Sequence, residues 1–341
     1  MYSHLTIFIL YIHTHIFMRF IPICNPIKIN MLYFTYVQLI ILCTIATLKP
    51  SIALNLSIVP FNEAFAPIYG NQSVVHSDDG KLIQISMDQR TPYGSGFTSQ
   101  YAYNHGVFTA LIKLPNNTYS AGVVASFYLQ NKELMRDEID FEFLGHIDGE
   151  KWVLQTNVYG NGSNQHRGRE ERYTLPFDPS QDFHNYTILW NTGRIIFYVD
   201  EWPIREVENV NGMGGDFPSK PMHLYGTIWD GSDWATYKGK YRVDIQRGPF
   251  VTGYSFVING CRVDKSVSVP DECDVAIPIG LMTSDERLRM KWFRGWCMTY
   301  SYCNDKDRSR DSFPECGVED PGIQLAPAPQ PVSSGASSRF I

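Results

Sequence analysis

The ten residues Arg136–Gly145, RDEIDFEFLG, alternate acidic with large apolar side chains. An alternation with a period of two is typical of a β-strand that buries one face and exposes the other. The apolar members are predicted to enter a core: Ile139, Phe141 and Phe143. The acidic members are predicted to share the opposite face: Glu138, Asp140 and Glu142. Because like charges in a row raise one another's pKa and serve no packing purpose, this face suggests chemistry.

The composition is that of a folded protein with many aromatic residues. Of its 341 residues, 44% are hydrophobic, 19% are charged and 14% are aromatic. The aromatic content suits a β-rich fold or a surface that stacks on sugar rings, and the net charge of −6 argues against nucleic acid as a partner. The sequence contains no phosphate loop, dinucleotide fingerprint or zinc-spaced Cys/His cluster, so we expect neither a cofactor nor a metal.

Residues 1–53 differ from the rest of the chain. A stretch without charged residues runs from Ile29 to Leu48, and small residues follow up to Ala53. This pattern predicts a signal peptide cleaved after Ala53, of ordinary length if translation starts at Met31. The alternative is a membrane anchor, since about 20 apolar residues span a bilayer. We favour secretion, with no stable membrane association after cleavage.

Glycosylation sequons and cysteines agree with an extracellular protein. The potential acceptors are Asn55, Asn71, Asn116, Asn161 and Asn185. The cysteines that remain after signal removal all lie in the last third of the chain: Cys261, Cys273, Cys297, Cys303 and Cys316. Pairing Cys261 with Cys273 and Cys303 with Cys316 would close two short loops, each worth about 3 kcal/mol of stability. An odd number of cysteines leaves one thiol over.

The remaining chain is predicted to form one β-rich domain with an extension. Residues 54–255 contain short apolar strands separated by Gly and Pro, which favours an antiparallel sandwich of the larger, curved jelly-roll type. Residues 256–320 are predicted to form a small disulfide-stapled extension in which Ser284-Asp285-Glu286 begins a short helix. The Pro- and Ser-rich residues 321–341 are predicted to be disordered.

The spacing of the acids suits a retaining glycosidase. Two strand positions span about 6.6 Å, so the Cα atoms of Glu138 and Glu142 would lie about 13 Å apart. Side chains that lean toward each other would bring the carboxyls to roughly 5 Å, the separation of a nucleophile and an acid/base in a retaining enzyme. Asp140 lies between them and could hydrogen-bond to the nucleophile. An acidic solvent-facing strand and a calcium site are the alternatives.

Flanking residues favour catalysis on a polysaccharide. Gln155-Thr156-Asn157 lies on what is predicted to be the next strand. Trp229, Asp230 and Trp234 follow in a glycine-rich segment. Flat indole faces and amide groups are what a groove for a neutral polysaccharide requires. We expect one of the two tryptophans to face the sugar.

Several motifs resemble those of plant xyloglucan endotransglucosylase/hydrolases, which belong to glycoside hydrolase family 16. These motifs are Asp137–Gly145, Gly94–Phe97, Ser120–Val124, Gln155–Tyr159, Phe177–Pro179 and Trp229–Trp234. The match runs in consistent order from about Val59 to Cys316. Asn161–Ser163 and Gly168–Tyr173 are most similar to the divergent third subgroup of the family, in its transglucosylating branch.

The resemblance implies a concave jelly-roll with an open cleft and a role for each acid. Glu138 would be the nucleophile, Asp140 its helper and Glu142 the acid/base. The positions that match substrate-binding residues of the family are Gln155, Asn157, Arg169, Trp229, Asp230, Gly231 and Trp234.

Three positions depart from the family's pattern. Arg136 replaces a histidine before the acidic motif, which could change the local charge. His146 replaces an asparagine, so the glycan expected beside the site moves to the nearest sequon, Asn161. Cys297 is additional to the family's two C-terminal disulfides and is expected to stay unpaired.

The resemblance implies a secreted enzyme of the plant cell wall. Its donor would be xyloglucan and its acceptor xyloglucan or an oligosaccharide. Transfer is expected to dominate. Hydrolysis is the alternative, because both reactions pass through the same covalent intermediate. A second alternative is another β-glucan donor, such as mixed-linkage glucan or cellulose. A third is a lectin-like protein that has lost turnover, which the three retained carboxylates disfavour.

Overall fold

The computed structural model describes residues 57–162, 168–213, 216–263, 282–308 and 313–317. All of them lie in one compact unit, Leu56–Ile341. The predicted signal segment 1–53, Cys273 and the tail 321–341 lie outside the described residues. Within the described part, no helix is long and apolar enough to cross a membrane.

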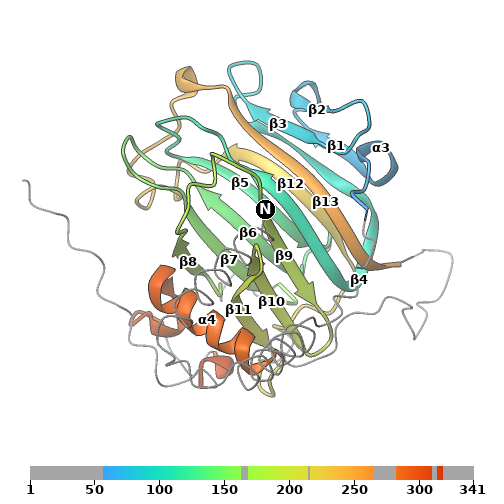
Figure 1. Ribbon diagram of the computed structural model, residues 1–341, viewed down its shortest axis with the longest axis vertical. Helices are drawn as coiled ribbons and strands as arrows, with labels where there is room; N and C mark the ends of the chain where they lie inside the picture. The colour runs from blue at the N-terminus through green and yellow to red at the C-terminus, as the bar shows by residue number, and fades with distance from the viewer. Residues whose placement is uncertain (1–56, 163–167, 214–215, 264–281, 309–312, 318–341) are drawn as a thin grey trace, which may run out of the picture. The chain divides into compact units, whose positions relative to one another are not determined.

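The described residues form an antiparallel β-structure (Figure 1). The strands are β1 (Phe65–Tyr69), β2 (Val74–His76), β3 (Ile83–Met87), β4 (Gly94–Lys113), β5 (Val123–Gln130), β6 (Glu138–Leu144), β7 (Val153–Tyr159), β8 (Glu171–Thr174), β9 (His184–Trp190), β10 (Arg194–Val199), β11 (Trp202–Glu208), β12 (Met222–Asp230), β13 (Phe250–Val263) and β14 (Met298–Ser301). The helices are α3 (Phe61–Ala64) and α4 (Ser284–Cys297), with short 3-10 turns at Asn71–Ser73, Ile245–Arg247, Tyr302–Asn304 and Pro314–Gly317.

The long strand β4 joins two layers. Its first half pairs with β1 and β12, and its second half pairs with β9 and β13. The halves meet at His105 and Gly106, whose φ angles are 67° and 155°. A Cβ at Gly106 would lie 2.6 Å from the Cα of Gly260 in β13, so only glycine fits where the two backbones meet. One layer therefore runs β1-β4-β12-β5-β6-β7-β8-β14, and the other runs β2-β3-β13-β4-β9-β10-β11.

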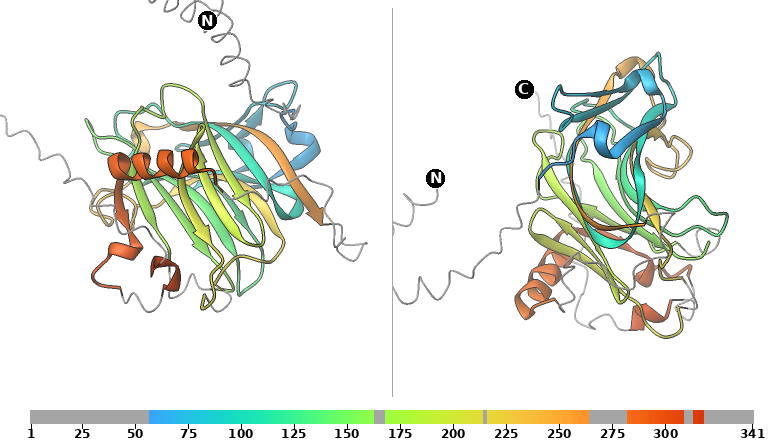
Figure 2. Two further views of the ribbon diagram at one scale, coloured as in Figure 1. Left: turned by 60° about the horizontal axis from the view of Figure 1, so that its bottom comes forward. Right: turned by 90° about the vertical axis from the view of Figure 1, so that its right-hand side faces the viewer.

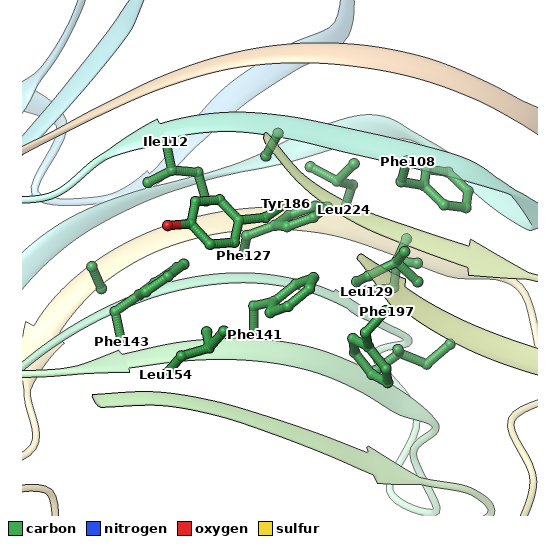
Figure 3. Packing of buried hydrophobic residues seen from close by; sticks show 14 of the residues in the cluster. Phe108, Ile112, Phe127, Leu129, Phe141, Phe143, Leu154, Tyr186, Phe197 and Leu224 are labelled. Carbon is green, nitrogen blue, oxygen red and sulfur yellow. The ribbon is translucent and has the colours of Figure 1, made fainter. Parts of the chain in front are cut away.

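The core fills the space between these layers (Figure 3). Ile139, Phe141 and Phe143 have no exposed surface, which confirms that the apolar side of the acidic strand faces inward. The Phe141 ring meets Phe197 of the other layer edge-on, with centroids 5.1 Å apart, and Phe143 meets Tyr186 in the same way at 4.7 Å. Because these rings lock β6 against the second layer, the carboxylates are directed away from the core. The predicted antiparallel jelly-roll sandwich is confirmed, and Figure 2 shows the curvature of its strands.

The C-terminal extension packs α4 along β11 (Figure 1) and adds β14 to the edge strand β8. The helix begins at Ser284, and its N-cap is Thr283: the Thr283 hydroxyl accepts from the Glu286 backbone N–H, and the Glu286 carboxylate accepts from the Thr283 backbone N–H. The expected domain boundary at residues 255 and 256 falls inside β13, which pairs with β4 on both sides of it.

The cysteines of the extension follow the predicted scheme where they are described. Cys303 and Cys316 form a disulfide. Cys261 is also disulfide-bonded, and its predicted partner lies outside the described residues. Among the described cysteines, Cys297 is a buried free thiol.

A buried charge cluster holds the extension to the sheet. Arg294 of α4 donates to both oxygens of Glu171 in β8, at 2.7 and 3.0 Å. Arg205 of β11 approaches the same carboxylate at 3.5 Å, and Tyr173 donates to it. These cations and the hydrogen bonds outweigh the cost of burial and lower the pKa of Glu171 to about 2.

Candidate active site

The register of the sheet places the three carboxylates in three parallel rows. The first row runs Ser126, Glu142, Gln155, Arg172 and Tyr300 across β5, β6, β7, β8 and β14. The second row runs Tyr128, Asp140 and Asn157, and the third runs Gln130, Glu138 and Tyr159. Because directly opposite residues share a face, each acid is flanked by polar or aromatic side chains from its neighbouring strands.

The acids lie at the bottom of a cleft of about 360 Å³. Its lining residues are Tyr69, Tyr93, Ser126, Tyr128, Gln130, Glu138, Asp140, Glu142, Thr227 and Trp229. The structure therefore brings together all three predicted acids and one predicted tryptophan. The contribution of β5 to the cleft was not predicted. Its signal was present, since Ser126, Tyr128 and Gln130 alternate with apolar residues just as the acids do.

Glu138 lies beside a cation and a hydrogen-bond donor. Gln130 Nε2 donates to Glu138 Oε2 at 2.8 Å, and Arg136 Nε lies 3.2 Å from the same oxygen. Burial raises the pKa of Glu138, whereas the Arg136 charge and the Gln130 hydrogen bond lower it. Among the described residues, Glu138 is the one of the three acids that forms a direct ion pair, and the Arg136 charge favours its ionised form.

Glu142 is partly buried at the cleft and lies near other acids. Burial is the largest cause that raises the pKa of Glu142 to about 7, and repulsion from Glu138 adds to it. A hydrogen bond of 2.7 Å from Gln155 Nε2 to Glu142 Oε2 opposes the rise. A carboxyl that holds its proton near neutral pH is suited to general acid and base catalysis.

Asp140 is more deeply buried and lies between the two glutamates. Burial raises the pKa of Asp140 well above its usual range, and both glutamates raise it further. Among the described residues, no hydrogen-bond partner reaches its buried Oδ1. The three carboxyls therefore repel one another in a desolvated row, so that not all of them can be ionised at neutral pH.

The other predicted substrate residues lie around the cleft in different ways. Gln155 contacts Glu142, as described above, whereas the Asn157 Oδ1 accepts the backbone N–H of Arg169 at 2.8 Å. Trp229 lines the cleft and donates from Nε1 to Ser126 Oγ at 3.3 Å. Trp234 packs behind it in a small apolar cluster, with ring centroids 6.1 Å apart.

Asp230 and Gly231 build the turn after β12. Asp230 Oδ1 accepts from the backbone N–H and the hydroxyl of Ser232. The Gly231 backbone donates to Gly122, and a Cβ at Gly231 would lie 2.6 Å from Val124 Cγ2. Neither residue is among those that line the cleft.

The structure places Arg169 in the interior and not on the cleft. Its side chain has no exposed surface, and it pairs with Asp216 at 3.1 Å and Glu315 at 2.6 Å. Its guanidinium also lies over the Phe313 ring, 5.4 Å from the centroid. Arg169 thus connects the segment before β8 to the C-terminal extension.

Two further sequence predictions concern the rim of the site. Asn161 is exposed, with a left-handed φ of 47°, and its backbone donates to Asp137 Oδ1 at 2.6 Å. Glycosylation at this position stays a prediction. Among the described residues, no group of three or more His, Cys, Asp or Glu side chains is arranged to hold a metal ion.

Two family models, several plant proteins and a solved structure match this chain. Residues 61–247 match the model of glycosyl hydrolases family 16, and residues 280–316 match that of the xyloglucan endo-transglycosylase C-terminus. The probable xyloglucan endotransglucosylase/hydrolase protein 28 of Arabidopsis thaliana is 47% identical over 289 residues, covering 82% of this chain and 86% of that protein. The xyloglucan endotransglucosylase/hydrolase protein 31 of Arabidopsis thaliana is 39% identical over 263 residues, covering 75% of this chain and 87% of that protein. A Bacillus licheniformis β-glucanase structure matches 62% of this chain and 98% of its own, at 21% identity and a TM-score of 0.48.

Proposed function

Because the chain belongs to the xyloglucan endotransglucosylase/hydrolases of glycoside hydrolase family 16, we propose that it is a retaining endotransglucosylase acting on xyloglucan. It cuts the β-1,4-glucan backbone of one chain and rejoins the new end to another xyloglucan chain or to an oligosaccharide. The observation that carries this proposal is the acidic row of β6. One end of the row, Glu138, lies beside a cation, and the other, Glu142, holds a proton near pH 7.

The first half of the reaction forms a covalent intermediate. The Glu138 carboxylate attacks the anomeric carbon and forms a glycosyl ester as the bond to the leaving oxygen breaks. Glu142 gives its proton to that oxygen, which departs as the hydroxyl of the released chain. Asp140, which lies between them on the same strand, assists the nucleophile as its neighbouring carboxyl.

The second half reverses these roles. Glu142 is now ionised and takes the proton from an incoming hydroxyl, which attacks the anomeric carbon and releases Glu138. If the hydroxyl belongs to a sugar the result is transfer, and if it belongs to water the result is hydrolysis. The outcome therefore depends on how well the cleft binds an acceptor, since the acids serve both reactions.

Transfer is supported by the way the extension enlarges the sheet. β14 continues the sheet beyond β8, so the polar face that begins at the carboxylates extends to Tyr300. Trp229 and the tyrosines of the cleft supply flat faces on which neutral sugar rings can stack. A longer polar and aromatic surface favours a bound sugar over water as the acceptor.

A labelled-acceptor assay tests this proposal. Incubation with xyloglucan and a fluorescent xyloglucan oligosaccharide should produce labelled polymer, with few new reducing ends. Reducing ends without labelled polymer would instead identify a hydrolase. A parallel panel with mixed-linkage glucan and cellulose tests the donor. Glu138→Gln should lose both products. Binding of xyloglucan without any product from the unaltered protein would indicate the lectin-like alternative.

The same proposal places the protein outside the cell. Its substrate is a cell-wall polysaccharide, so we infer that the mature protein is secreted to the apoplast. N-terminal sequencing of the protein recovered from culture medium should begin immediately after Ala53. Recovery in the membrane fraction with an intact N-terminus would support the anchor instead.

A further inference from the structure

A chain of contacts connects the C-terminal extension to Glu142. Tyr300 lies opposite Arg172, Arg172 opposite Gln155, and Gln155 opposite Glu142 in consecutive strands. The Arg172 guanidinium lies over the Tyr300 ring, with Cζ 5.5 Å from the centroid. Arg172 Nε donates to Gln155 Oε1 at 2.8 Å, and Gln155 Nε2 donates to Glu142 Oε2 at 2.7 Å.

The chemistry of arginine decides which way the Gln155 amide lies. A guanidinium carries only hydrogen-bond donors, so the atom of Gln155 that faces Arg172 must be the carbonyl oxygen. The NH₂ group is then turned toward Glu142, to which it can only donate. A donor at this place stabilises the ionised carboxylate more than the protonated acid.

We propose that Arg172 is a positioning residue for Glu142, which it serves by holding the Gln155 amide with its NH₂ toward the carboxyl, and that Tyr300 holds Arg172 in place. The extension would thereby take part in setting the protonation of the acid/base. The inference rests on the proposed function for the role of Glu142, and it adds a residue that neither the predicted site residues nor the cleft lining includes.

The charges around Glu142 show why a donor that stabilises its ionised form is needed. Glu138 and Asp140 lie on the same strand, and Glu170 lies beside β8. Glu138 and Glu170 raise the pKa of Glu142 in addition to burial, whereas Gln155 and the Arg172 charge lower it. The residues that face it from β5 and β12 are the neutral Ser126, Thr227 and Trp229. Since Glu142 must both give and take a proton, a pKa near the working pH serves both half-reactions.

Direct titration of Glu142 tests the proposal without relying on turnover. Protein labelled with [δ-13C]glutamate is titrated by NMR, and the Glu142 signal is assigned by its absence in Glu142→Gln. Arg172→Met removes the charge and the donor, so we expect the midpoint to rise by roughly half a pH unit or more. Arg172→Lys keeps the positive charge and a hydrogen-bond donor, so its Glu142 midpoint should stay close to that of the unaltered protein. The alkaline limb of kcat/KM on xyloglucan should move in the same direction as the NMR midpoint.

Tyr300 supplies the matched pair of controls. Tyr300→Ala removes the ring under Arg172 and should raise the Glu142 midpoint by less than Arg172→Met does. Tyr300→Phe keeps the ring and should leave the midpoint unchanged. If Arg172→Met fails to fold, the Tyr300 pair and Arg172→Lys decide the question.

The outcomes separate this inference from the proposed function. An unchanged midpoint in Arg172→Met, with only a lower melting temperature, would overturn the inference and assign Arg172 a structural role. A raised midpoint in a protein that neither transfers nor hydrolyses xyloglucan would support the positioning role and refute the proposed function.

Discussion

Arg136 Nε lies 3.2 Å from Glu138 Oε2, just before the acidic row begins. The motif resemblance places a histidine at this position, so a group that titrates near neutral pH is replaced by a permanent cation. The cation opposes the rise that burial causes in the pKa of Glu138. The Arg136 charge therefore favours ionisation of Glu138, the proposed nucleophile, at lower pH.

Replacing Arg136 by Gln should shift the acidic limb of the pH–rate profile upward by about half a pH unit. The nucleophile must be ionised, so this limb follows the pKa of Glu138, and removing a cation raises that pKa. The Arg136 side chain is 40% exposed, so high salt should move the limb of the unaltered enzyme toward that of the variant. Arg136→Lys serves as the matched control. Identical acidic limbs in the Gln variant and the unaltered enzyme would contradict the assignment.

Glu142→Ala should lower transfer from xyloglucan by about 10²–10⁴-fold, because the leaving sugar oxygen then lacks its general acid. An aryl glycoside whose leaving group needs no proton should lose much less in its first half-reaction. Added azide should restore release of the glycosyl ester, since it attacks without a general base. An equal loss with both donors would rule out the acid/base role of Glu142.

Glu171→Gln should destabilise the fold by about 3–5 kcal/mol, because it leaves Arg294 and Arg205 buried without their counter-ion. The depressed pKa of Glu171, about 2, also sets a pH dependence. The stabilisation is complete above the unfolded-state pKa and is lost as the pH falls from about 4.5 toward 2. Thermal melts over this range should fall more steeply for the unaltered protein than for the variant. Parallel curves would mean that Glu171 contributes no pH dependence.

Trp229→Ala should raise KM for xyloglucan by about tenfold, since an exposed indole face in the cleft contributes roughly 1–2 kcal/mol of stacking. Trp234→Ala should act mainly on the melting temperature, because that ring packs against Trp229 and the small apolar cluster behind it. Trp229→Phe keeps a flat face and controls for the loss of volume. A larger KM effect at Trp234 than at Trp229 would reverse this division of roles.

Local patterns in the sequence were sufficient to predict the acidic strand. A period of two is a property of the extended backbone, so the inward position of Phe141 and the outward position of Glu142 follow from their neighbours in the chain alone. The short apolar runs between Gly and Pro likewise predicted the antiparallel sandwich. The short separation of Cys303 and Cys316 in the sequence predicted the disulfide between them.

Contacts between distant segments could not be predicted in this way. Arg169 matches a cleft position by motif, yet it is buried against Asp216 and Glu315, which lie 47 and 146 positions away. Nothing near Arg172 in the sequence indicates that Tyr300 lies beside it. The register of β5 and β7 beside β6, and of β8 beside β7, decides which side chains meet Glu142. The pairing of β14 with β8 adds Tyr300 from the far end of the described chain. The alternation of residues determined that the acids share a face, whereas the pairing of strands decided which side chains surround each acid.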